Sequence, residues 1–133
     1  MHKDLEDTFH KVVEILQKDE RCKGGWHYGS ISRGEEDIYS DYDPVFLVAD
    51  MDFEVFAADV PKVLAKASDE LVIFWGESFN NEHFKNYCSI LRLGDDLHQF
   101  DFFIINADYP EEWINSIVKD ARRSILYLIV MER

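Results

Sequence analysis

The sequence predicts a single α+β domain over residues 1–133, in which a mixed sheet is flanked by helices. Segments of helical period alternate along the chain with short apolar runs of strand type. The chain has 133 residues, of which 47% are hydrophobic, and only two cysteines. A chain of this length can bury one core without a disulfide or a structural metal but is short for two cores. We therefore expect one compact unit with reduced cysteines.

Three segments have the spacing of an amphipathic helix, with apolar residues every three or four positions. They cover residues 5–21, 52–67 and 113–128. The last of them follows a helix-start signal at residues 108–111. The segment 125–131 is apolar all round, and it packs on the sheet, forms a subunit contact or leads into a further helix.

Five runs have the composition of strands: 26–28, 41–48, 71–75, 87–93 and 98–105. The pair Gly24-Gly25 is expected to separate the first helix from the first strand. Pro44 favours an edge strand, or a position whose missing amide faces away from a neighbour. We expect 71–75 to be buried and the last two runs to form a hairpin around residues 94–96.

The charge of the chain restricts its partners. Fourteen Lys and Arg against 27 Asp and Glu give a formal net charge of −13, which disfavours nucleic acids and anionic membranes and favours a cationic partner. The first residues mix charges with apolar side chains, unlike a signal peptide, and no run is long enough to span a membrane. We expect a cytoplasmic protein.

One group of residues points to phosphate and metal chemistry. Gly29 and Ser30 follow a predicted strand, where a glycine allows backbone amides to approach a phosphate and the serine adds a hydroxyl. Asp41 and Asp43 stand at i and i+2, on one strand face, where two carboxylates can share a hard cation such as Mg²⁺. Asp101 lies in an apolar strand, where a charge is costly without a partner. We expect the three aspartates to converge at one end of the sheet.

In this order, the Gly-Ser pair, the Asp-x-Asp and the later strand aspartate resemble the polymerase-β-like nucleotidyltransferase superfamily. The phrases GSISRGEEDIYSDYDPVFLVAD and ILRLGDDLHQFDFFIIN look most like antibiotic nucleotidyltransferases of the streptomycin 6-adenylyltransferase and lincosamide groups. The resemblance covers residues 26–108. The helical substrate-binding domain of the long streptomycin-type enzymes has no counterpart here.

The resemblance implies the nucleotidyltransferase fold and a set of roles. Asp41, Asp43 and Asp101 would bind Mg²⁺ and act in catalysis, and Gly29 and Ser30 would hold a nucleoside triphosphate, with ATP favoured. Arg33 contacts phosphate or pairs on the surface with a neighbouring glutamate, and the sequence leaves both readings open. Glu77 is a candidate auxiliary base.

Three functions are compatible with these residues. The first is transfer of a nucleoside monophosphate, favoured to be AMP, to a hydroxyl of a small cationic acceptor, as in antibiotic resistance. The second is a minimal antitoxin-type nucleotidyltransferase that modifies or binds a partner protein, and the third is an inactive nucleotide-binding domain. Because one small domain provides only one wall for a bulky acceptor, we also expect a homodimer joined through the apolar segment 125–131.

Overall fold

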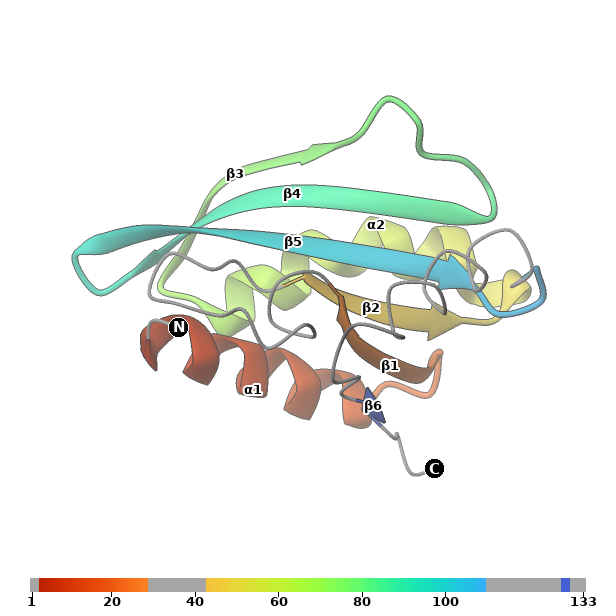
Figure 1. The fold of residues 1–133 in the computed structure, drawn as a ribbon, viewed down its shortest axis with the longest axis horizontal. Helices are drawn as coiled ribbons and strands as arrows, with labels where there is room; N and C mark the ends of the chain where they lie inside the picture. Colours follow the sequence, from red (N-terminus) through yellow and green to blue (C-terminus); the bar gives the residue numbers. More distant parts are fainter. Residues whose placement is uncertain (1–2, 29–42, 110–127, 130–133) are drawn as a thin grey trace.

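The fold was analysed in a computed structural model that describes residues 3–28, 43–109 and 128–129. In this part of the chain, two helices and six strands make one small α+β unit with a mixed sheet (Figure 1). The elements are α1 (Lys3–Gln17), β1 (Cys22–Tyr28), β2 (Asp43–Val48), α2 (Asp50–Ala67), β3 (Glu70–Gly76), β4 (Phe84–Leu93), β5 (Asp96–Asn106) and β6 (Leu128–Ile129).

The strands form one sheet in the order β3-β4-β5-β2-β1-β6. All neighbouring pairs are antiparallel except β2 and β5, which are parallel. The connection between β2 and β5 contains α2, β3 and β4, so the two central strands come from distant parts of the chain. β4 and β5 form the predicted hairpin, and its turn contains Gly94 with a positive φ of 65°.

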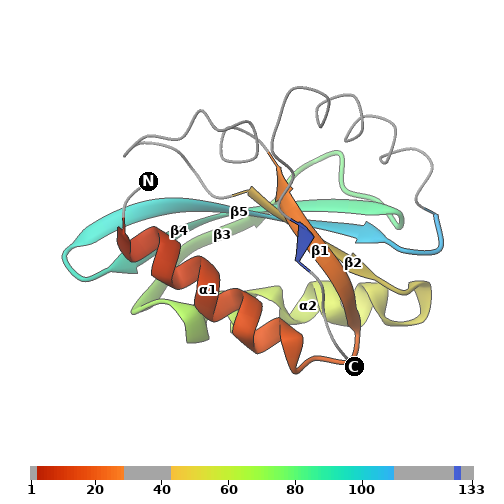
Figure 2. The ribbon, with the colours of Figure 1, turned by 60° about the horizontal axis from the view of Figure 1, so that its bottom comes forward.

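Both helices cover the same face of the sheet, as Figure 2 shows. The main core lies between them and the sheet, and its largest fully buried side chains include Phe46, Phe53, Phe56, Phe100 and Phe102. The ring centroids of Phe46 in β2 and Phe102 in β5 lie 4.9 Å apart, so these two side chains pack together across the two central strands. We call this side the helix-covered face. The opposite side, which neither of the described helices covers (Figure 2), we call the open face.

The start of α2 is fixed by residues at the end of β5. The backbone amide of Asp50 donates to the Asp108 carboxylate at 2.9 Å, which provides the capping bond that Ala49 cannot. The buried Asn106 amide donates to the Asp50 carboxylate at 2.8 Å and to the Glu82 carbonyl at 3.1 Å. These bonds hold the end of the central strand against the helix.

The structure corrects the expected boundaries near the first strand. The first helix ends at Gln17 rather than near Arg21, and Gly24 and Gly25 lie inside β1 instead of breaking the chain before it. Gly25 is needed there because a Cβ would lie 2.6 Å from the Val45 carbonyl oxygen. Pro44 also lies in an interior strand, since β2 is hydrogen-bonded to β1 and β5, so the edge-strand expectation is wrong. Pro44 stands near the start of β2, one residue before Val45, where the parallel pairing with β5 begins, so its missing amide is tolerated.

Two further expectations are wrong. The run 71–75 is an edge strand rather than a buried one, and Val72, Ile73 and Trp75 are exposed. An apolar run alone does not distinguish a central strand from an exposed edge. Residues 128–129, expected in a helix, form β6 and pair with Gly25 and Trp26 of β1. The rest of the predicted third helix lies outside the described residues.

Neither described helix has the length and apolar composition needed to cross a membrane.

Candidate functional site

The predicted site residues are only partly within the described chain. Gly29, Ser30, Arg33 and Asp41 lie outside the described residues. The backbone of Asp43 is described as the first residue of β2, and Asp101 is described in full near the middle of β5. The geometry of the candidate site therefore rests on two neighbouring strands.

The parallel register of β2 and β5 brings two of the predicted aspartates to neighbouring positions. Val45 is the partner of Phe103 in this register. Asp43 and Asp101 each stand two residues before that pair, so continuation of the register sets their backbone positions side by side. Strand alternation assigns both positions to the face of Val45, which is the open face. Asp41 lies outside the described residues, so the expected convergence of the three aspartates at one end of the sheet stays a prediction.

On its other side, Asp101 lies next to Cys88 of β4, and Cys88 in turn lies next to Trp75 of β3. Trp75, Cys88, Asp101 and position 43 therefore form one row across four strands of the open face, which we call the acidic row. Asp101 is half-buried, whereas 42% of Trp75 is exposed. The row thus runs from a central carboxylate to an exposed indole ring.

The Cys88 thiol is bonded within this row. It donates to a Glu77 carboxylate oxygen at 3.0 Å. Burial of the thiol, the bond to Glu77 and the negative charge of Asp101 all raise the pKa of Cys88 far above its ordinary value. Cys88 is therefore held as a neutral donor between two carboxylates and is not an activated nucleophile.

Asp101 has a second polar neighbour two residues before it in β5. The side-chain amide of Gln99 lies 3.2 and 3.4 Å from the two Asp101 carboxylate oxygens. This weak contact compensates part of the cost of placing a charge among apolar neighbours.

Whether these residues fit a divalent cation depends on the donor set. No group of three acidic, histidine or cysteine side chains suited to a metal occurs within the described ranges 3–28, 43–109 and 128–129. Two carboxylate-bearing positions on adjacent strands of one face fit the oxygen preference of Mg²⁺. That Asp43 and Asp101 hold such an ion together with Asp41 stays a prediction from the sequence, because Asp41 lies outside the described residues.

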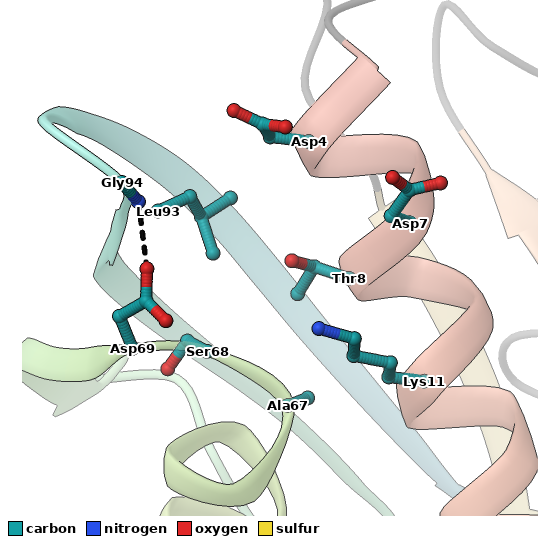
Figure 3. A pocket seen from close by; sticks show the side chains of 9 residues that line it. All are labelled: Asp4, Asp7, Thr8, Lys11, Ala67, Ser68, Asp69, Leu93 and Gly94. Carbon is teal, nitrogen blue, oxygen red and sulfur yellow. Dashed lines mark hydrogen bonds between the residues drawn. The ribbon is translucent and has the colours of Figure 1, made fainter.

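A hollow of about 190 Å³ lies elsewhere, between the start of α1 and the turn of the β4–β5 hairpin (Figure 3). Its charged lining consists of Asp4, Asp7, Asp69 and Lys11. The Asp69 carboxylate accepts a hydrogen bond from the Gly94 amide at 2.7 Å and so holds the turn in place. None of the predicted site residues lines this hollow, and its carboxylates do not form a metal site.

The sequence prediction missed Cys88 and Trp75 as members of the row. A two-residue turn at 94–95 pairs Leu93 with Asp96, and the same register pairs Cys88 with Asp101. The sequence pattern predicts a turn over residues 94–96, which includes Asp96 and so does not give this register. A turn of two residues, 94 and 95, would have given the register and thereby identified Cys88 as the partner of Asp101.

No protein-family model matches this chain, and no curated protein matches it in sequence.

Proposed function

We propose that the protein is a Mg²⁺-dependent nucleotidyltransferase that moves a nucleoside monophosphate, favoured to be AMP from ATP, to a hydroxyl of a small cationic acceptor. The observation that supports the proposal is the parallel pairing of β2 with β5, in which Val45 is the partner of Phe103. Continued by two residues, this register would make the backbone positions of Asp43 and Asp101 neighbours. It agrees with the order of motifs in the sequence, in which an Asp-x-Asp pair precedes a single strand aspartate.

The proposed reaction forms a bond between the acceptor oxygen and the α-phosphorus and breaks the bond from that phosphorus to the bridging oxygen of pyrophosphate. The hydroxyl proton passes to a carboxylate, for which Asp101 is our choice. Bound Mg²⁺ would neutralise phosphate charge and align the attacking and leaving oxygens. Gly29, Ser30 and Arg33 are proposed to hold the triphosphate.

The acceptor is proposed to be cationic because of charge. The chain has a formal net charge of −13, which attracts cations at long range. On the open face, the Glu77 carboxylate accepts a hydrogen bond from Cys88, so it adds a second negative charge near Asp101. Amino groups on the acceptor would be attracted to this face.

The test has one step that needs no acceptor and one that does. Binding of ATP is measured by calorimetry with and without Mg²⁺, and pyrophosphate release is then measured with aminoglycosides and lincosamides. We expect Mg²⁺-dependent binding, and we expect Asp101→Asn to lower turnover at least 100-fold, as loss of a metal-binding catalytic carboxylate does.

Asp96→Asn is the matched control, since it removes the same charge from the exposed first residue of β5. It should keep both binding and turnover. Absence of Mg²⁺-dependent ATP binding in the folded wild type would contradict the proposal whatever the acceptor. Equal turnover in Asp101→Asn and the wild type would contradict the assigned role of Asp101.

A further inference from the structure

The free edge of β3 differs from the other strands of the sheet. β3 is the last strand on its side of the sheet in the described chain, whereas the opposite edge is the two-residue β6. Within β3, Val72, Ile73 and Trp75 are 42%, 51% and 42% exposed. An exposed apolar edge strand presents unpaired backbone groups that can pair with another strand.

This edge lacks most of the features that prevent pairing. It contains no lysine and no proline, and its single charged residue, Glu70, is paired with Arg92 at 3.2 Å. The register irregularity of β3 falls between Leu71 and Ile73. Residues 73–76 therefore remain as a regular free run.

The direction of the backbone groups also suits pairing. The Glu77 amide donates to the Asn86 carbonyl at 3.1 Å and thus points toward β4. Since this direction alternates along a strand, the amides of Gly76 and Phe74 point away from β4, to the free edge.

We propose that β3 pairs antiparallel with β3 of a second copy, which joins two sheets into one continuous sheet. A two-fold axis at Phe74 sets Ile73 of one copy opposite Trp75 of the other and Val72 opposite Gly76. Ile73 and Trp75, two of the three exposed apolar side chains of each edge, then cover Trp75 and Ile73 of the other copy. No carboxylate faces a carboxylate within these pairs. We choose a second copy as the partner because, in this register, the apolar Ile73 of one copy faces the apolar Trp75 of the other.

This contact lies at the edge of the sheet opposite to β6. The homodimer expected through the apolar segment 125–131 stays a prediction, because most of that segment lies outside the described residues. The contact through β3 also affects the open face. A two-fold axis perpendicular to the sheet keeps both open faces on the same side, and Ile73 of the second copy extends the acidic row beyond Trp75. If the proposed function holds, the second copy thereby forms part of the wall beside the acceptor.

The experiment measures mass in solution and needs no substrate, so its failure is separate from that of the proposed function. Sedimentation equilibrium of the full chain at micromolar concentrations should give twice the 15.7 kDa of one copy. Ile73→Lys places a charge at the centre of the contact and should give the monomer. Leu97→Lys is the matched control, because Leu97 is also an exposed apolar residue, at 61%, and lies in β5. This control should remain a dimer.

Backbone exchange provides a second measurement that needs no variant. Amide exchange of Phe74 and Gly76 should slow as the wild-type concentration rises and the edge becomes paired. A monomeric wild type, a dimer that survives Ile73→Lys, dissociation by Leu97→Lys, or exchange at these two amides that does not depend on concentration would each overturn the proposal.

Discussion

The two faces of the sheet use aromatic and charged residues in different ways. On the helix-covered face, Phe102 contacts the rings of Phe46 and Phe56 at centroid distances of 4.9 and 6.5 Å and is fully buried. On the open face, its neighbour Phe103 packs in a smaller cluster with Val45, Phe84 and Ile105, and Asp101 lies half-buried beside Cys88. One strand therefore contributes alternately to the core and to the candidate site, which means that stability and chemistry can be tested separately.

The largest expected effect compares the adjacent phenylalanines of β5. Phe102→Ala leaves a cavity between the sheet and α2 and should lower the free energy of unfolding by about 3–5 kcal/mol. Phe103→Ala removes a half-buried ring from the smaller cluster and should cost clearly less. Urea denaturation of both variants measures the difference. Equal losses would mean that the two faces are packed equally well.

The second prediction concerns the lack of space near β1. In Gly25→Ala the new Cβ would lie 2.6 Å from the Val45 carbonyl oxygen and 2.7 Å from a Phe46 ring carbon, so we expect a loss of about 1–3 kcal/mol. Gly76→Ala is the control at the edge strand, where the nearest atom is the Asn80 side-chain nitrogen at 3.0 Å. The Asn80 amide is held by two hydrogen bonds to the Asn86 backbone, at 2.9 and 2.7 Å, so thermal unfolding should show some loss at Gly76. That loss should be smaller than at Gly25, because the overlap at Gly25 is closer and involves a backbone carbonyl. A larger loss at Gly76 than at Gly25 would reverse the comparison.

The third prediction tests the electrostatics of the open face. Asp101→Asn removes a negative charge that helps to raise the Cys88 pKa, so this pKa should fall. It should stay above the ordinary cysteine value of about 8.5, because burial and Glu77 still act on the thiol. Ultraviolet absorbance of the thiolate during a pH titration gives the value, with Asp96→Asn as control. An unchanged titration in Asp101→Asn would show that the two side chains are not coupled.

The smallest expected effect lies at the rim of the helix-covered face. The Arg21 guanidinium donates to the Asp59 carboxylate at 2.8 Å, and this bond is the main cause that lowers the pKa of Asp59. Because the folded-state pKa is lowered, the stabilisation is present above the unfolded value of about 4 and is lost as the pH falls through the folded value. Urea unfolding should therefore show the wild type more stable than Asp59→Asn at neutral pH, with the difference disappearing in acid. A difference that persists in strong acid would exclude the ion pair as its cause.

The sequence predicted the elements whose patterns depend on local geometry. The period of α1, the apolar spacing of α2 and the β4–β5 hairpin follow from side chains a few positions apart, and all three are present. The predictions that were wrong concern features that depend on residues far away in the sequence. Gly25 is accepted inside a strand because Phe46 occupies the space beside it, and β3 is an edge because no other described strand pairs with its outer side.

The candidate site shows the same division. The motif order indicated Asp43 and Asp101, but their adjacency depends on the pairing of β2 with β5, which residue spacing does not determine. The place of Cys88 between Asp101 and Glu77 depends on the hairpin register and on the path of the chain after β3. Both relations are tertiary and required the structure.

The parallel pairing of β2 with β5, the single parallel pair among the described strands, has a consequence for the order of folding. The β4–β5 hairpin closes through a short turn and can form early, whereas β2 and β5 can pair only after the chain between them has been brought together. Closing a long loop costs entropy before its contacts are gained, which slows contacts of high sequence separation. In a refolding experiment, the Cys88–Asp101 pair should thus assemble with the hairpin, and position 43 should join it in a later, slower phase.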